Sequence, residues 1–326
     1  MKEITFINQN RGRWKKLEQE LESGASESPD ALGALYIQLT DDLAYAKTYY
    51  PQSDITNYLN RLTLQIHQQI YRNRKESPQR FNLFWSRELP MVIFENRKQL
   101  LYSFLIFSLA VAIGWVSQMN DATFVRLILT DSYVNMTLDN IGNNDPMAVY
   151  KQANESVMFL GITINNIKVA FMAFMMGIFT AMGTGFILFQ NGIMLGTFQS
   201  FFYQKGLFWE SAKVIWIHGT LEISAIIIAG SAGMVLGNAF LFPGTYSRMH
   251  QFKKGVKNGI KIALGLVPVF ITAGFLEGFV TRHTGMPAPL VLLIIGASLL
   301  FIIWYFIIYP IKTNKLTLQH YAKPTH

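Results

Sequence analysis

The sequence predicts an all-α, polytopic membrane protein in which six transmembrane helices follow an N-terminal cytoplasmic helical domain. Of its 326 residues, 51% are apolar and only 15% are charged, whereas soluble domains carry about 25% charged residues. Residues 1–98 hold 26 of the 48 formal charges, so the longer remainder of the chain is depleted in charge. Apolar stretches in that remainder reach the roughly 20 residues that a helix needs to cross a bilayer.

The polar head, residues 1–98, is predicted to fold as three helices. Pro29 is expected in the first turn of the second helix, and Asp54 is expected to cap the third. Each segment carries apolar residues at helical spacing. These residues are Phe6, Trp14, Leu17 and Leu21, then Leu32, Leu35, Leu39, Leu43 and Ala46, and finally Tyr58, Leu62, Ile66 and Ile70.

Six spans are predicted within residues 99–310. Residues 169–203 contain no Asp, Glu, Lys or Arg, and as one helix they would extend about 52 Å, which is too long for a single crossing. The dipeptide Asn191-Gly192 is a turn signal near the middle of this stretch, so the stretch is predicted to form two spans. The other four spans are residues 100–119, 212–242, 260–281 and 288–309.

The distribution of basic residues predicts the orientation. The head carries 14 Lys and Arg residues, the loop 243–261 carries five and the tail 311–326 carries three, while the other segments together carry six. Basic segments remain on the cytoplasmic side of a membrane, which places both termini inside. We therefore expect a multi-pass protein of the cytoplasmic (inner) membrane. Its net charge of +8 then reflects the asymmetry of its loops across the lipid bilayer rather than contact with nucleic acid.

The segment 120–168 is predicted to lie outside the membrane. It is mildly acidic, with five acidic residues against three basic ones. The spacing of Phe124, Leu127, Ile128 and Val134 predicts an amphipathic helix at the outer surface.

Three ionisable residues are predicted inside the membrane. Glu222 follows His218 by four residues, so both occupy one helix face, about 15 Å and 9 Å from the outer end of their span. Glu277 falls near the outer end of the next span, so the topology brings all three into the outer half of the membrane. Charged groups at such positions are costly and usually face the protein interior.

Two interpretations of this intramembrane polar site remain open. The three side chains either form hydrogen bonds that hold helices together, with protonated carboxyls, or they form a proton, cation or substrate site in an outward-facing cavity. A metal site is a third, weaker alternative, because only one histidine and two carboxylates are present and no His-Glu-x-x-His helix occurs. We therefore predict no metal and no cofactor.

Glycines at small-xxx-small spacing predict close helix packing. They are Gly192 and Gly196 in the third span and Gly230, Gly233 and Gly237 in the fourth. The same faces could pair two copies of the chain, so a homodimer is also considered. Neither the phosphate-binding loop motif nor a Gly-x-Ser-x-Gly elbow is present, so we expect no enzymatic activity.

Several motifs together resemble the stage II sporulation protein M family. They are Asn165-Asn166, Asn191-Gly192, the stretch from His218 to Glu222, Pro243-Gly244, and residues 273–281 around Glu277. The head is similar to that of the long, non-sporulation branch, through Phe6, Arg13-Trp14 and residues 58–62. The resemblance implies an integral cytoplasmic-membrane protein without established catalytic activity, in which His218, Glu222 and Glu277 are key positions.

Two functions follow as hypotheses. The first is a non-enzymatic scaffold or component of a cell-envelope complex, because the family's namesake belongs to a membrane complex with peptidoglycan-degrading partners. The second is a transporter, channel or permease subunit that uses His218, Glu222 and Glu277. A water-accessible cavity that reaches Glu222 would favour the second.

Overall fold

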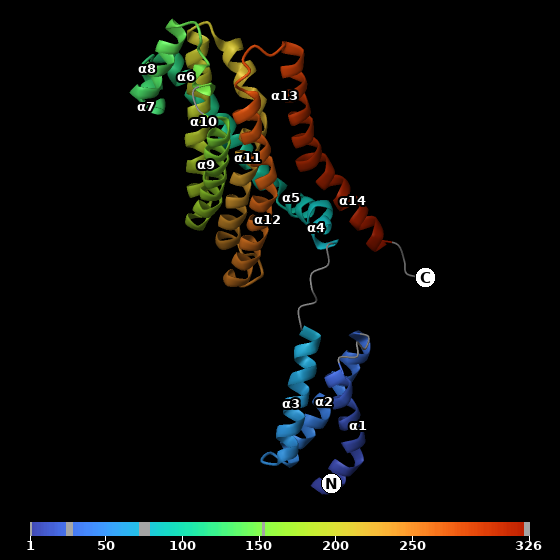
Figure 1. Cartoon of the computed structure of the whole chain (residues 1–326). Helices are drawn as coiled ribbons and strands as arrows, with labels where there is room; N and C mark the ends of the chain where they lie inside the picture. Colours follow the sequence, from blue (N-terminus) through green and yellow to red (C-terminus); the bar gives the residue numbers. More distant parts are fainter. Residues whose placement is uncertain (1, 24–28, 72–78, 152–153, 323–326) are drawn as a thin grey trace. The chain divides into compact units, whose positions relative to one another are not determined.

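The computed structural model describes residues 2–23, 29–71, 79–151 and 154–322, and every regular element within them is helical. Contacts divide the chain into two compact units, Met1–Arg80 and Phe81–His326 (Figure 1). The prediction of an all-α fold is therefore confirmed for the described residues.

The first unit is made of helices α1 (Glu3–Ser23), α2 (Pro29–Tyr49) and α3 (Asp54–Tyr71). Its core contains Trp14, Leu39 and Ile66, all at most 2% exposed. The indole Nε1 of Trp14 donates a 2.9 Å hydrogen bond to Oδ2 of Asp42, which also pairs with Arg13. The predicted helix starts at Pro29 and Asp54 are confirmed, whereas the side chains of Leu21, Leu32 and Ile70 lie outside the described residues.

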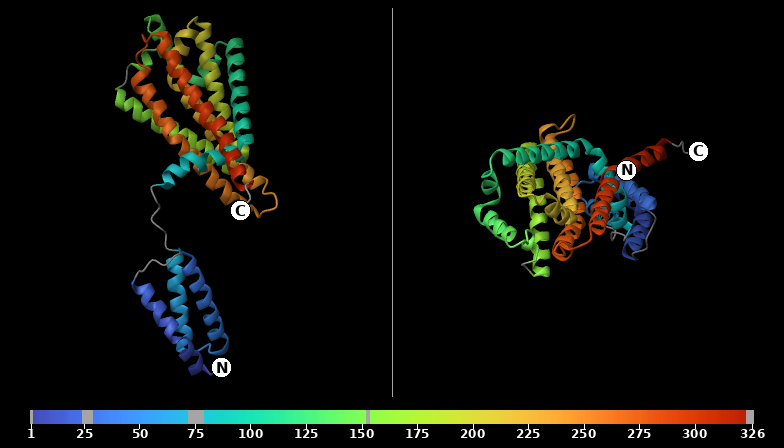
Figure 2. Two further views of the ribbon diagram at one scale, coloured as in Figure 1. Left: turned by 90° about the vertical axis from the view of Figure 1, so that its right-hand side faces the viewer. Right: turned by 90° about the horizontal axis from the view of Figure 1, so that it is seen from above.

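The second unit is a bundle of long helices (Figures 1 and 2). The long helices are α6 (Arg97–Asn120), α9 (Glu155–Met175), α10 (Thr180–Gln204), α11 (Phe208–Leu241), α12 (Arg248–Phe275) and α13 (Ala288–Ile303). Helix α11 contacts the other five long helices. It is the central helix of the bundle, and most of its residues from Ala225 to Gly237 are buried.

Shorter elements connect and extend these helices. They are α4 (Gln79–Leu83), η1 (Phe84–Glu88), α5 (Leu89–Glu95), α7 (Phe124–Leu129), α8 (Asp131–Gly142), η2 (Ala148–Tyr150), η3 (Met176–Phe179), η4 (Leu276–Val280), η5 (Trp304–Ile308) and α14 (Tyr309–Ala322). Elements η1, η4 and η5 are π-helical turns, and η2 and η3 are 3₁₀ turns.

Five helical stretches are long and apolar enough to cross a membrane: Arg97–Asn120, Glu155–Gln204, Phe208–Leu241, Arg248–Val280 and Ala288–Leu316. The chain is therefore a membrane protein. The second stretch contains α9, η3 and α10, and the two helices lie side by side in the bundle (Figure 1).

The predicted turn at Asn191-Gly192 is wrong. Both residues lie inside α10, and the chain reverses instead through η3 at Thr180, whose φ is 78°. A Cβ atom on Gly192 would lie 2.7 Å from the carbonyl oxygen of Phe107, so this glycine permits close packing against α6. A buried helix keeps its backbone hydrogen bonds because no water can replace them. A dipeptide that favours a turn elsewhere therefore does not interrupt the helix there.

Residues 81–98, predicted as the end of the head, pack within the second unit. Nζ of Lys261 on α12 lies 2.5 Å from Oε2 of Glu88, and the hydroxyl of Tyr305 donates a 2.8 Å hydrogen bond to the carbonyl of Trp85. Leu89 is fully buried in the main core. Through these contacts, residues 81–98 connect α12 with the C-terminal helices.

The segment between α6 and α9 forms two helices rather than the single one predicted. They meet at Thr130, whose φ of 73° breaks the helix. Val125 and Val134 are buried against Phe201 and Phe202 of α10, whereas Leu127 is 78% exposed. Helices α7 and α8 and turn η2 therefore cover one end of the α10–α11 pair.

Candidate functional site

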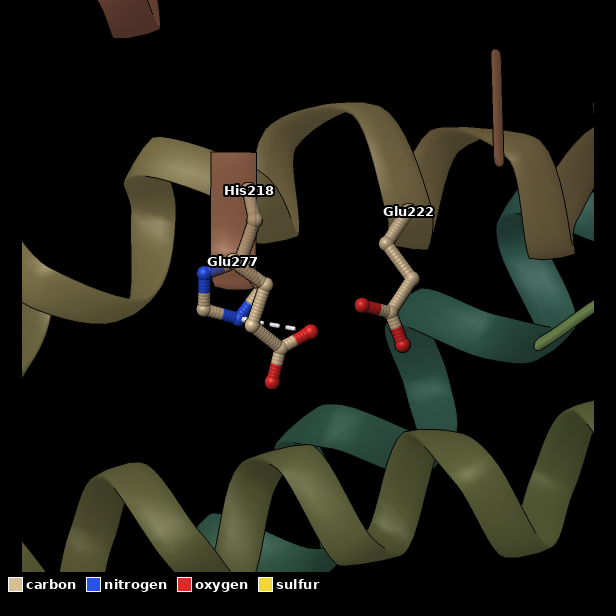
Figure 3. A group of neighbouring side chains, drawn as sticks. All are labelled: His218, Glu222 and Glu277. Atoms are coloured by element: carbon tan, nitrogen blue, oxygen red, sulfur yellow. Dashed lines mark ion pairs between the residues drawn. The ribbon is translucent and has the colours of Figure 1, made fainter. Parts of the chain in front are cut away.

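His218, Glu222 and Glu277 meet at one place in the second unit. One ligand-type atom from each residue lies within 4.8 Å of the other two. His218 Nε2 and Glu277 Oε2 are 3.8 Å apart (Figure 3). The carboxylate of Glu222, one turn further along α11, is directed to the same side (Figure 3). These side chains form the polar cluster.

A π-helical turn positions the α12 side of the polar cluster. Glu277 lies in η4, and the amide of Thr281 donates a 2.8 Å hydrogen bond to the carbonyl of Leu276, five residues earlier. Residues four apart lie on the same face of a helix. Glu277 and Thr281 therefore both reach His218, one at each ring nitrogen: His218 Nδ1 lies 3.0 Å from Oγ1 of Thr281.

The polar cluster is enclosed by protein. The side chains of His218 and Glu277 are 6% and 13% exposed, and the ring of Tyr150 lies 5.8 Å from that of His218. Burial raises the pKa of Tyr150 well above its ordinary value, and the neighbouring Glu277 carboxyl adds to the effect. The phenol of Tyr150 therefore stays protonated at neutral pH and can donate a hydrogen bond.

A cavity of about 470 Å³ opens beside the cluster. Helices α9, α10 and α11 form its walls, and α7, α8 and η2 contribute its outer part. Its polar lining consists of Tyr133, Tyr150, Asn165, Asn166, Asn191, His218 and Glu222. The other lining side chains are mostly apolar, so the few polar groups converge in a largely apolar pocket, as is typical of ligand sites.

The cavity unites the asparagines of the family motif with the polar cluster. Asn166 is 5% exposed, and its amide interacts with the carboxyl of Glu222. Asn191 donates its Nδ2 to the carbonyl of Ile187 at 2.8 Å, so its Oδ1 remains available as an acceptor. Asn165 is exposed and lies at the rim.

The basic side chain that follows Thr281 is engaged elsewhere. Arg282, next to Thr281, pairs with Glu155 at 2.7 Å and donates to the carbonyl of Lys151 at 3.3 Å. No lysine or arginine is among the cavity-lining residues of the described ranges. Within the described ranges, the cavity lining thus offers the Glu222 carboxyl no lysine or arginine partner.

The other predicted positions lie away from the cavity centre. Gly192 and Gly196 approach α6, and Gly230, Gly233 and Gly237 approach Leu188, Thr184 and Ala181 of α10. Pro243 and Gly244 form the turn after α11, where Gly244 has a φ of 63°.

Sequence reasoning missed three residues of the site. Thr281 follows Glu277 by four residues, which is a usable signal once both are placed on a helix. Tyr133 and Tyr150 reach the cavity from α8 and η2, and no local pattern in the sequence indicates that contact.

The fold and the cavity together define a helical membrane protein with a buried carboxylate–imidazole site. A family model described as Stage II sporulation protein M matches residues 103–282, and the chain belongs to that family. A second model, described as a domain of unknown function, matches residues 4–72.

One curated relative is an uncharacterized protein of Methanocaldococcus jannaschii. It is 22% identical over 198 residues, which cover 60% of this chain and 83% of the relative. No solved structure matches the chain.

Proposed function

We propose that the chain crosses the cytoplasmic membrane six times, with both termini and the Met1–Arg80 unit inside. A continuous helix of 50 residues would extend about 75 Å, and the break at η3 supports two crossings by the stretch Glu155–Gln204. The start of α12, from Arg248 to Lys261, carries five basic residues, which favours the cytoplasm for that end. The cavity then opens in the outer half of the membrane.

Within this topology the chain is proposed to act as a cation-transport component, a channel or a permease subunit. The observation that carries the proposal is the cavity that reaches Glu222 and His218. Ionisable groups within membrane helices typically mark ion or substrate pathways. Carboxylates and amide oxygens select cations over anions. The lack of a lysine or arginine among the lining residues of the described ranges also favours a positively charged substrate.

Reconstitution into liposomes tests this proposal. Proton, Na⁺ and Mn²⁺ fluxes would be measured for the full chain, for Glu222→Gln and for Glu210→Gln, an exposed residue of the same helix. The wild type and Glu210→Gln are expected to conduct at least one of these cations, and Glu222→Gln is expected to match empty liposomes. Flux of none of them, or full flux in Glu222→Gln, would contradict the proposal.

A second function, a non-enzymatic scaffold in a cell-envelope complex, is favoured by a separate observation. The Met1–Arg80 unit has its own core and exposes Ile4, Ile37 and Leu64, which are 74%, 63% and 54% exposed. Exposed apolar side chains of this size are typical of contact surfaces when they cluster. In this role the head binds envelope proteins while the bundle anchors it in the bilayer.

Crosslinking in cells tests the scaffold. The full chain is expected to capture a defined protein partner, and Ile37→Glu, which leaves the core intact, is expected to lose it. Thr40→Glu, an exposed substitution one turn away on α2, serves as the control for added charge. Equal capture by all three chains would argue against this surface.

A further inference from the structure

We propose that the polar cluster binds a divalent transition metal ion, with His218, Glu222 and Glu277 as ligands. The inference deepens the proposed cation transport and rests on it for the route by which the ion reaches the cavity. It names the class of ion that this site takes.

The spacing of the donor atoms fits one ion. In a site with metal–ligand bonds of about 2.0–2.2 Å, neighbouring ligand atoms lie about 3–3.5 Å apart. His218 Nε2 and Glu277 Oε2 are 3.8 Å apart, too far for a hydrogen bond, and all three donors lie within 4.8 Å. Side-chain movements of about 1.5 Å or less would bring them to bonding positions.

The imidazole is held in the manner of a metal ligand. His218 uses Nδ1 for its 3.0 Å contact with Thr281, which leaves Nε2 directed at the carboxyls (Figure 3). Ligating histidines almost always use their second ring nitrogen for such an outer contact, which fixes the orientation of the ring. Thr281 is therefore a positioning residue.

Charge favours a cation at this point. Two buried carboxyls near one imidazole repel each other when ionised, and Arg282, next to Thr281 in the chain, is paired with Glu155. A divalent ion would neutralise both carboxylates at once. It would thereby remove the cost of placing them in a weakly polar interior.

Two asparagines of the same cavity support this arrangement. The amide of Asn166, 95% buried, interacts with the carboxyl of Glu222. Such an outer contact orients a ligand carboxylate. Asn191 presents a spare Oδ1 in the cavity, because its Nδ2 is bonded to its own helix.

The donor set indicates the class of metal. One imidazole nitrogen and two carboxylate oxygens suit Mn²⁺, Fe²⁺ or Zn²⁺, whereas Mg²⁺ and Ca²⁺ prefer oxygen ligands alone. We expect Mn²⁺ and Zn²⁺ to bind and Mg²⁺ and Ca²⁺ to compete weakly.

The test uses the full chain in lipid nanodiscs after removal of metals with a chelator. Mn²⁺ binding is measured by loss of the free-ion electron paramagnetic resonance signal, and Zn²⁺ by competition. One ion per chain is expected for the wild type and for Glu210→Gln. Glu222→Gln and Glu277→Gln, which keep side-chain shape, are expected to lose most of the affinity. Thermal melting verifies that each variant is folded.

A spectroscopic readout adds an independent criterion. Bound Mn²⁺ should show coupling to an imidazole nitrogen, and this coupling should vanish in a folded His218→Gln chain. No binding by the wild type, unchanged affinity in both glutamine variants, or bound Mn²⁺ without nitrogen coupling would each overturn the metal site.

The two proposals fail separately. If Glu222→Gln abolishes proton or Na⁺ flux while the wild type binds neither Mn²⁺ nor Zn²⁺, transport stands and the metal site fails. If Mn²⁺ binds with the expected ligands and no cation crosses the membrane, the metal site stands and transport fails.

Discussion

Nδ1 of His218 on α11 and Oγ1 of Thr281, directly after η4, lie 3.0 Å apart, although 63 residues separate them in the chain. This contact fixes the imidazole plane and assigns the opposite nitrogen, Nε2, to Glu277. Glu277 lies in the π-helical turn η4 and Thr281 directly follows it, and their four-residue spacing places both on one face. Turns of this kind occur frequently at functional sites.

Replacement of Thr281 should therefore weaken the site without removing a ligand. Thr281→Val deletes the hydroxyl and frees the ring, and we expect Mn²⁺ affinity to fall by about 10–100-fold, as for other outer contacts of metal ligands. Thr281→Ser should restore the affinity because it restores the hydroxyl. Equal affinities in the two variants would show that this contact does not position His218.

Close contact between η3 and α11 predicts the effect of an added methyl group. A Cβ atom on Gly177 would lie 2.1 Å from the carbonyl oxygen of Gly233, which is backbone and cannot move aside. Gly177→Ala should destabilise the bundle by about 1–3 kcal/mol, measured by thermal unfolding in detergent. Gly161→Ala on α9, with no atom within 4 Å of its Cβ position, is the control and should be neutral or stabilising.

The ion pair between Glu88 and Lys261 should hold residues 81–98 against α12. The two side chains are 31% and 22% exposed, with Nζ and Oε2 2.5 Å apart. Glu88→Gln and Lys261→Gln should each destabilise the unit by about 1 kcal/mol, because each leaves a partly buried charge without its partner. The double variant should lose less than the sum of the two, and strict additivity in the cycle would mean that the pair is not coupled.

Tyr58 predicts a pH dependence in the first unit. Burial, followed by a 3.1 Å hydrogen bond to Glu18 and the charge of that carboxylate, raises the pKa of Tyr58 to about 12. An unfolded tyrosine has a pKa of about 10, so the folded state holds this proton more tightly. The corresponding stability is fully present below pH 10 and is lost as the pH rises towards 12.

A phenolate absorbance titration checks this. The difference between the wild type and Tyr58→Phe should be one group that titrates near pH 12 in the folded protein. A difference centred near pH 10 would contradict the burial and the contact with Glu18.

Periodicity predicted the head well because its helices bury one face each. Each helix contributes a member of its predicted apolar stripe to the core, Trp14 from α1, Leu39 from α2 and Ile66 from α3. Helix α3 also begins at Asp54. The membrane-spanning segments could also be predicted, since apolar runs of about 20 residues are typical of transmembrane helices.

The break in the Glu155–Gln204 stretch could not be predicted in the same way. Thr180 and Gly177 carry no strong turn signal in sequence, and the reversal there depends on tertiary contact between Gly177 and Gly233. Asn191-Gly192 does carry such a signal, but the contact of Gly192 with α6 keeps α10 helical. Tertiary packing thus decided where the chain turned.

The site was partly accessible to sequence reasoning. The four-residue spacing of His218 and Glu222 placed them on one face, and opposite helix directions brought Glu277 to the same level. Tyr150 could not be placed, since its contact with His218 depends on how the segment after α8 folds over α10 and α11.

Access of water to the cavity from the outer side is the central claim, and a single introduced cysteine tests it directly. The chain has no cysteine of its own, so Asn191→Cys would carry the only reactive thiol, and Lys254→Cys would mark the opposite end of the bundle. A membrane-impermeant thiol reagent should label Asn191→Cys in right-side-out vesicles and Lys254→Cys in inside-out vesicles. Labelling of Lys254→Cys from outside, or of Asn191→Cys from the inside alone, would contradict the account.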